Sequence, residues 1–292
     1  MDNKKIENIK SQDFGIEIEV EGITREQAAK AIAGYFGKTA KYIGNEVGYG
    51  AWGFKDNEGR LWKCVKDSSL ANYGCEVVSP ICYYKDLSVI EDIVEILKSL
   101  GATVSYRTGI HIHIGAQKMD ANQLRNLINT FSNHEDMIFK ALKVAHDREI
   151  DYCRKTDKKF LKILNTEKPN STAKFFDIWY DTLAPHDSRE EHYNCSRYHA
   201  VNFHATYTKG TVEFRLFNSV LDKKKVSSYI IFCMALIAQA IEARRVSTKK
   251  IDSDNEKYSM RTWLRQLGLN GEEFKILRRV FLEKLHGDVA FR

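Results

Sequence analysis

The chain has 292 residues, and its 43% hydrophobic and 29% charged residues are ordinary for a globular protein that buries a sizeable core. A formal net charge of +6 permits anionic ligands such as nucleotides but is too small to indicate a nucleic acid partner. The N-terminal stretch has no apolar run typical of a signal peptide, and the run at residues 229–241 is too short to span a bilayer. Six scattered cysteines without a CxxC pair are typical of reduced thiols, so we expect a cytoplasmic protein with no membrane partner.

The N-terminal part of the chain alternates between predicted strands and a helix. Apolar and polar residues alternate over residues 14–22, which predicts a strand. A helix is expected over residues 24–37, with Thr24 as its N-cap and a glutamine three residues later completing a capping box. The next two strands are expected to form a hairpin around the turn "KDNEG", at residues 47–54 and 60–67.

The rest of the chain continues this mixed pattern. The expected elements are a strand at 75–80, a helix at 85–101 with Gly101 as its C-cap, a strand at 109–115, a long helix at 120–144, two short helices within the polar stretch 150–196, and a hairpin at 197–207 and 210–218. From Asp222 onward the chain is expected to be helical. The pattern predicts an α+β fold, in which helices lie on one face of an antiparallel sheet.

Two of the predicted strands place ionisable groups opposite their apolar residues. Because side chains alternate between the two faces of a strand, Glu17, Glu19 and Glu21 share one face of "FGIEIEVEG". In "TGIHIHIG", His111 and His113 likewise share the face opposite three isoleucines. Taken alone, each row has an ordinary explanation, either a solvated strand face or hydrogen bonds across a polar face.

Further acids and an arginine stand at equivalent positions. Glu213 and Arg215 share the polar face of "TVEFRLF", where the ordinary explanation is a cross-strand ion pair. Asp67 ends one strand and Glu76 begins the next, and such acids are commonly caps or turn residues. Carboxylates crowded on one sheet face repel each other unless cations lie between them. Carboxylate oxygens suit Mg²⁺ or Mn²⁺, and an arginine beside such ions stabilises a phosphoryl group in transfer, so the conjunction predicts a metal–nucleotide site.

Other interpretations stay open at this point. The pair His111-x-His113 alone could hold zinc, although zinc would want a further nitrogen or sulfur ligand. Cys195 lies near two histidines in the sequence, but a cysteine in a polar loop is commonly incidental. Asn202 could contact a substrate or satisfy neighbouring backbone groups. A metal-dependent phosphohydrolase or nuclease could also use clustered acids, and a binding module could keep such a fold without catalysis.

Six motifs in order carry a resemblance: "FGIEIEVEG", "KDSSL…CEVVSP", "TGIHIHIG", "REIDYC", "RYHAVNF" and "GTVEFRLFNSVLD". From about Phe14 to about Ile241 the chain resembles the amidoligase family, which belongs to the glutamine synthetase/glutamate–cysteine ligase superfamily of carboxylate–amine ligases. The resemblance implies ATP-dependent ligation of a carboxylate to an amine through an acyl phosphate. It also implies a curved antiparallel sheet that forms a half-barrel, like the glutamine synthetase catalytic domain, with helices on the outer face and a helical C-terminus.

The resemblance implies a set of metal ligands. In that superfamily the two glutamates of the ExE strand bind different metal ions. Carried over to this chain, Glu17 with Asp67 and Glu76 would hold one ion. The ion nearest the γ-phosphate would be held by Glu19, His111 and Glu213. The cofactors expected on this basis are ATP and two or three Mg²⁺ or Mn²⁺ ions.

The resemblance also implies groups for the transfer itself. Arg215 would stabilise the transferred phosphoryl group, and Arg197 and Arg148 are weaker candidates to bind the nucleotide or act in the transfer. His113 is expected to contact the substrate, and Glu21 and His113 are the candidates to accept the proton of the amine. The expected substrates are small-molecule or peptide carboxylates and amines, glutamyl compounds among them. We expect residues 1–245 to form the catalytic domain and residues 246–292 to form a linker and helical extension packed on it.

Overall fold

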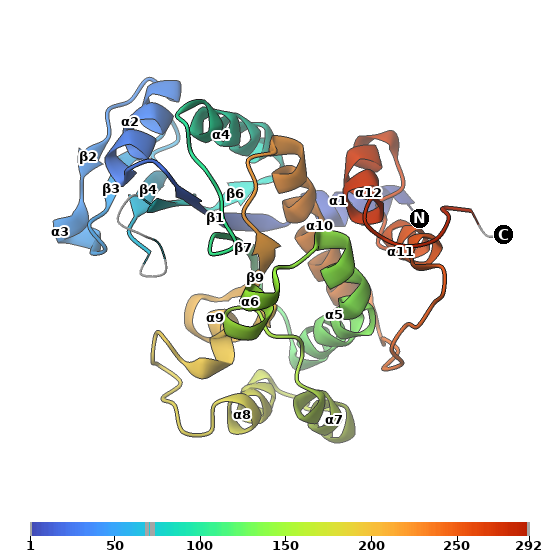
Figure 1. The fold of residues 1–292 in the computed structure, drawn as a ribbon. Helices are drawn as coiled ribbons and strands as arrows, with labels where there is room; N and C mark the ends of the chain where they lie inside the picture. Colours follow the sequence, from blue (N-terminus) through green and yellow to red (C-terminus); the bar gives the residue numbers. More distant parts are fainter. Residues whose placement is uncertain (1, 68–69, 71–73, 291–292) are drawn as a thin grey trace. The chain divides into compact units, whose positions relative to one another are not determined.

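The computed structural model of the chain describes residues 2–67, 70 and 74–290 and shows an α+β protein with an antiparallel sheet and many helices (Figure 1). The chain divides into two compact units. Unit 1 comprises residues 1–12, 114–216 and 231–292, and unit 2 comprises residues 13–113 and 217–230. Two of the points where the chain passes between the units lie inside strands β7 (Gly109–Gly115) and β9 (Thr211–Asn218).

Unit 2 contains most of the strands. Their order is β2 (Lys41–Tyr42), β3 (Trp52–Lys55), β4 (Leu61–Val65), β5 (Gly74–Val78), β1 (Asp13–Glu21) and β7, with β6 (Cys82–Tyr83) beside the start of β1. The hairpin expected around "KDNEG" is confirmed, because β3 and β4 pair antiparallel. Of the "KDSSL" motif and the residues up to Gly74, the stretches 68–69 and 71–73 lie outside the described residues.

Two helices of unit 2, α2 (Arg25–Tyr35) and α4 (Leu87–Ser99), lie on the same side of its sheet (Figure 1). The capping box at Thr24 is confirmed, since its hydroxyl accepts from the backbone N–H of Gln27 and its own N–H donates to the Gln27 side chain. After α2, the ring of Phe36 packs against Phe54 and Trp62. The covered face of β3 and β4 is therefore the one that carries these two aromatic residues. The short helix α3 (Gly44–Val47) and the 3₁₀ turn η1 (Tyr84–Asp86) also belong to this unit.

Unit 1 is mainly helical. Its elements are α1 (Asp2–Lys10), α5 (Ala121–Leu142), α6 (His146–Asp151), α7 (Lys158–Glu167), α8 (Thr172–Leu183), η2 (Cys195–Arg197), β8 (Val201–Asn202), α9 (His204–Lys209), most of β9, the later part of α10 (Lys223–Glu242), α11 (Glu256–Gln266), η3 (Glu272–Phe274) and α12 (Lys275–Leu282). β8 pairs antiparallel with β9, which places Asn202 opposite Glu213. Fully buried aromatic rings from α7, α8 and the end of β8 pack edge to face, Phe160, Phe175 and Phe203 among them.

One sequence prediction in unit 1 is wrong. The second hairpin was expected to have strands at 197–207 and 210–218, but its first strand ends at Asn202 and helix α9 follows. The side-chain oxygen of Asn202 accepts a hydrogen bond from the backbone N–H of His204 at 2.8 Å, an Asx turn that starts the helix. Gly210, at φ 75°, ends the helix in the left-handed conformation. His204, inside the expected first strand, is therefore the first residue of a helix.

Helix α10 contains the apolar run at 229–241. Among the described helices it is the one whose length and hydropathy would suit a membrane span, and 72% of the relevant window is buried inside the structure. A buried core helix passes the same test.

Candidate metal site

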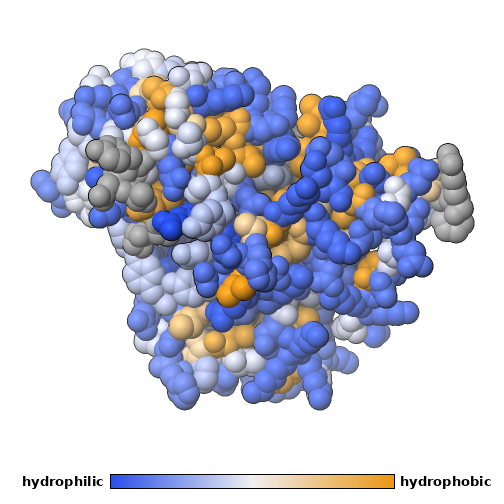
Figure 2. All heavy atoms as spheres, in the orientation of Figure 1, coloured by the Kyte–Doolittle hydropathy of each residue, from blue (hydrophilic) through white to orange (hydrophobic). Residues whose placement is uncertain are grey.

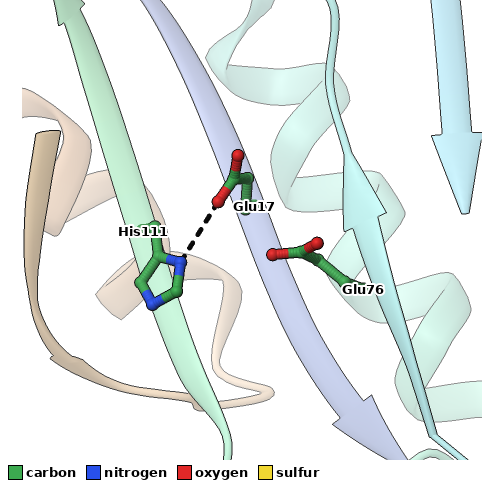
Figure 3. A group of neighbouring side chains, drawn as sticks. All are labelled: Glu17, Glu76 and His111. Carbon is green, nitrogen blue, oxygen red and sulfur yellow. Dashed lines mark hydrogen bonds and ion pairs between the residues drawn. The ribbon is translucent and has the colours of Figure 1, made fainter. Parts of the chain in front are cut away.

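Carboxylates and imidazoles gather on one face of three neighbouring strands in unit 2. Glu17 on β1 lies between His111 on β7 and Glu76 on β5 (Figure 3). The Nδ1 atom of His111 lies 3.1 Å from one carboxylate oxygen of Glu17, and Nε2 of His113 lies 3.4 Å from the other. The alternation in the sequence predicted that both histidines share one face of their strand. Because β7 is the neighbour of β1 in the sheet, both lie beside Glu17 on the acidic strand.

Unit 2 contains two sets of three residues that could hold a metal ion. Within each set, the potential ligand atoms all lie within 4.8 Å of one another. The first set comprises Glu17, Glu76 and His111, and the second comprises Glu19, Asp67 and Glu76. Glu76 belongs to both sets because it pairs directly opposite Glu19 on the neighbouring strand. This grouping divides Glu17 and Glu19 differently from the division that the resemblance implied, and the assignment of individual ions stays a prediction.

The charges in this cluster are unevenly balanced. Burial alone would raise the pKa of Glu17, but His113 and His111 outweigh it and hold that pKa well below its usual value. For Glu76, burial and then the neighbouring carboxylates of Glu17, Glu19 and Asp67 raise the pKa well above its usual value. Ionisation of Glu76 is therefore disfavoured by the groups that surround it. A cation at this place would favour the ionised form of this carboxyl.

The strand that bears these acids is fixed at Glu19, which is 3% exposed. One oxygen of its carboxylate accepts a hydrogen bond from the backbone N–H of Gly109 at 2.6 Å. Its backbone carbonyl accepts from the hydroxyl of Ser219 at 2.6 Å. Neither contact could be predicted from the sequence, because nothing local marks a glycine N–H or a serine after a strand as the partner of a residue so distant in the chain.

The donor set fits a hard divalent cation. Carboxylate oxygens dominate both sets, with one imidazole, which is the chemistry preferred by Mg²⁺ and Mn²⁺. Zinc would want thiolate or further imidazole ligands, and neither of these two sets in unit 2 contains a cysteine. Burial instead raises the pKa of the nearby Cys75 thiol to about 12, which opposes thiolate formation.

Unit 1 contains a second network of predicted site residues. The Nη1 atom of Arg215 lies 2.5 Å from Oε1 of Glu213, and the amide of Asn202 donates to Oε2 of Glu213 at 2.5 Å. Arg215 also donates from Nε to the carbonyl of Tyr152, and Arg148 donates to the carbonyl of Arg215 at 3.1 Å. Three of the predicted site residues, Glu213, Arg215 and Arg148, therefore lie together in this network. Asn202, for which two roles stayed open, satisfies both a backbone N–H and a carboxylate.

Arg197 makes different contacts. Its guanidinium donates to the carbonyl of His192 at 2.8 Å and lies over the rings of Tyr193 and Tyr198. These contacts do not connect it to the network of Glu213 and Arg215. The thiol alternative loses support too, because a hydrogen bond to Asp187 raises the pKa of Cys195.

Comparisons with known proteins give one family and a weak structural likeness. The sequence model of the family described as "Putative amidoligase enzyme" matches residues 10–237. Among solved structures, the chain is similar to the crystal structure of a bifunctional glutathione synthetase from Pasteurella multocida, with 14% sequence identity and a TM-score of 0.44. The match covers 96% of this chain and 48% of that chain, so this chain spans about half its length. No curated protein sequence matches the chain.

Proposed function

The chain belongs to the amidoligase family, and on that premise we propose that it is an ATP-dependent carboxylate–amine ligase that forms an amide bond through an acyl phosphate. The observation that carries the proposal is the cluster in unit 2, where two sets of ligand atoms share Glu76 and suit Mg²⁺ or Mn²⁺. Such ions are what a polyphosphate substrate needs beside it.

The proposal includes the finer architecture implied by the resemblance. We propose that the antiparallel sheet is the curved half-barrel of a glutamine synthetase-like catalytic domain. Support comes from unit 2, where α2 and α4 lie on one side of the sheet and the carboxylates lie on the other face. The division into residues 1–245 and 246–292 remains part of this proposal.

The residues of the cluster would have distinct tasks. Glu17, Glu19, Asp67, Glu76 and His111 would hold the divalent ions, which would neutralise the charge of the phosphates when bound. The same role for Glu213 remains a prediction from the resemblance.

Arg215 would meet the charge that spreads over the migrating phosphoryl group. Arg215 is 5% exposed, and its guanidinium is held by Glu213 and by the carbonyl of Tyr152, so it is oriented before a substrate arrives. A donor fixed in this way stabilises a transition state without reorganising. Arg148 supports Arg215 by donating a hydrogen bond to its backbone carbonyl. Arg197 is the weaker candidate, because its hydrogen bond goes to the carbonyl of His192 and not to Arg215 or Glu213.

The chemistry requires an activated carboxylate and a deprotonated amine. A carboxylate is a poor acyl donor because its leaving group would be oxide, and phosphorylation replaces this with phosphate. The amine must then lose a proton as it attacks the carbonyl carbon. His113 is the candidate acceptor for that proton, since it is 8% exposed and lies beside Glu17, whose carboxylate would stabilise the imidazolium.

The proposal is tested by the substrate dependence of ATP consumption. Purified protein with Mg²⁺ and ATP is mixed with pools of glutamyl compounds, peptides and amines, and ADP release and product mass are measured. Hydroxylamine is added in a parallel assay, because it captures acyl phosphates as hydroxamates. We expect ADP release that depends on a carboxylate, and a hydroxamate of that carboxylate. Phosphate release without any carboxylate would instead identify a hydrolase, and binding of Mg·ATP without turnover would identify a binding module.

A further inference from the structure

The face of unit 2 that carries the carboxylate cluster continues into a row of lysines. Strand registers define this face, because residues directly opposite each other point to the same side of a sheet. Val78 on β5 pairs with Glu17 on one side and with Lys63 on the other. With strands about 4.8 Å apart, the backbones of Glu17 and Lys63 lie about 10 Å from each other.

Two more lysines follow on the outer strands. Lys63 on β4 pairs with Gly53 on β3, and Gly53 pairs with Lys41 on β2. Lys55, two residues beyond Gly53, belongs to the same face. Lys63 is half-buried, whereas Lys55 and Lys41 are exposed. We call Lys63, Lys55 and Lys41 the lysine row.

The lysine row has no carboxylate of its own. In the part of the chain that the structure describes, none of the three ammonium groups lies at ion-pair distance from an acid. Lys85 of the same unit shows the contrast, because it pairs with Glu58 at 3.1 Å. A row of cations without carboxylate partners, which begins with Lys63 about 10 Å from Glu17 and runs outward over β3 and β2, is an arrangement that attracts a ligand with several negative charges.

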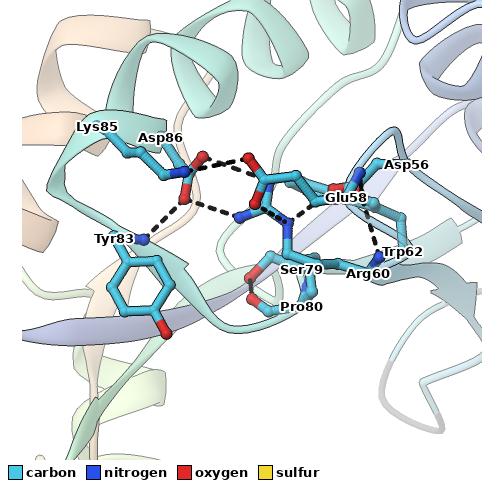
Figure 4. A network of polar contacts seen from close by, with 9 residues as sticks. All are labelled: Asp56, Glu58, Arg60, Trp62, Ser79, Pro80, Tyr83, Lys85 and Asp86. Atoms are coloured by element: carbon cyan, nitrogen blue, oxygen red, sulfur yellow. Dashed lines mark hydrogen bonds and ion pairs between the residues drawn. The ribbon is translucent and has the colours of Figure 1, made fainter.

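The hairpin that bears Lys63 and Lys55 is held rigidly. Arg60, in the turn between β3 and β4, donates to the buried carboxylates of Asp56 and Asp86, both at 2.9 Å (Figure 4). The indole of Trp62 donates to Asp56 as well. These contacts fix the two strands that bear Lys63 and Lys55, so the backbone at these lysines is in place before a ligand binds.

We propose that the lysine row binds the phosphate chain of a nucleoside triphosphate, with Lys63 as the innermost contact. This inference rests on the proposed function, because the metal ions of the cluster would bind one part of the phosphate chain. The remaining phosphate oxygens would then extend across β5 to Lys63, where an ammonium group without a counter-ion donates to them. The two exposed lysines act at longer range and contribute less, since solvent screens their charges.

The test is calorimetric titration of the full chain with ATP, ADP and adenosine, each with Mg²⁺. Lys63→Gln should weaken binding of ATP and ADP about 10-fold or more, as expected for the loss of one charge-assisted hydrogen bond. Lys63→Arg, which keeps the charge, should recover most of the affinity. Adenosine binding should not change. The control is Lys98→Gln, an exposed lysine on α4 of the same unit, which should bind ATP as the unaltered chain does.

The outcomes separate this inference from the proposed function. If the unaltered chain binds Mg·ATP and Lys63→Gln binds it equally well, the lysine row is wrong and the proposed function stands. An equal loss for adenosine would also overturn the inference, because the contact would not be with phosphate. If the unaltered chain binds no Mg·ATP, both proposals are wrong. A metal-induced rise in melting temperature that Lys63→Gln retains shows that the variant is folded with its carboxylate cluster intact.

Discussion

Replacing Glu76 by glutamine should change the stability of the protein in opposite directions without and with metal. Glu76 belongs to both ligand sets, and its pKa is raised by burial and then by Glu17, Glu19 and Asp67. A raised folded-state pKa means that the contribution of this carboxyl to stability is fully present below its unfolded pKa and is lost as the pH rises through the folded value. Glutamine resembles the protonated form, so the advantage of Glu76→Gln in metal-free protein should grow with pH.

The magnitude follows from the geometry. At 4.8 Å, the separation within which these ligand atoms lie, two ionised carboxylates repel by about 3.5 kcal/mol at an effective dielectric constant of about 20. The histidines beside Glu17 and partial protonation offset much of this repulsion. We therefore expect Glu76→Gln to stabilise the metal-free protein by about 1–3 kcal/mol at neutral to alkaline pH, a rise in Tm of roughly 2–6 °C. Metal at about 100 times its Kd should then stabilise the unaltered protein by about 2.7 kcal/mol and the variant by far less.

The assay is thermal unfolding between pH 5 and pH 9, in chelator and in saturating Mn²⁺. The control is Glu95→Gln on α4, which makes the same change of charge away from the sheet face and should behave as the unaltered protein. A metal-free variant that is no more stable than the unaltered protein at high pH would show that the carboxylates do not repel as the geometry requires. Equal stabilisation of both proteins by Mn²⁺ would show that Glu76 is not a ligand.

Three further predictions concern other parts of the chain. Arg60→Met leaves two buried aspartates without their cation and should lower the free energy of unfolding by about 3–5 kcal/mol, whereas Lys85→Met, which breaks an exposed pair, should cost less than about 1 kcal/mol in the same denaturation experiment. Burial raises the pKa of Glu135 from 4.5 to about 7, so its contribution to stability is full below pH 4.5 and lost by about pH 7. Glu135→Gln should therefore remove a decrease of about 3 kcal/mol in the free energy of unfolding between these two pH values. A variant whose free energy of unfolding keeps the same pH dependence would refute the assignment. Arg215→Lys should lower kcat at least roughly 10²-fold while ATP binding weakens much less, as measured by ADP release beside ATP titration; near-normal turnover would remove Arg215 from the catalytic residues.

The sequence by itself determined the features that depend on near neighbours in the chain. Strict alternation in "FGIEIEVEG" and "TGIHIHIG" fixed which side chains share a strand face, because a strand has no other period. The capping box at Thr24 and the hairpin around "KDNEG" were equally readable, since their hydrogen bonds join residues a few positions apart. Six motifs in order indicated the family that the comparison later matched over residues 10–237.

The local pattern misled at one place. "RYHAVNFHATY" alternates as a strand would, but Asn202 caps the backbone N–H of His204 and so favours a helix. Whether a strand or an Asx turn forms here depends on the side chain of Asn202. The amide of that side chain also donates a hydrogen bond to Glu213, 11 residues further along the chain. Alternation alone does not decide such a competition.

Only the tertiary structure decided how the candidate ligands group. Periodicity shows that Glu17 and Glu19 share a face, but it does not show that Glu76 lies opposite Glu19 or that both histidines lie beside Glu17. These facts depend on the order and register of β5, β1 and β7, which are set by hydrogen bonds between residues that lie far apart in sequence. The opposite pKa shifts of Glu17 and Glu76 follow from that register, because charge interactions depend on distance in space and not on distance along the chain.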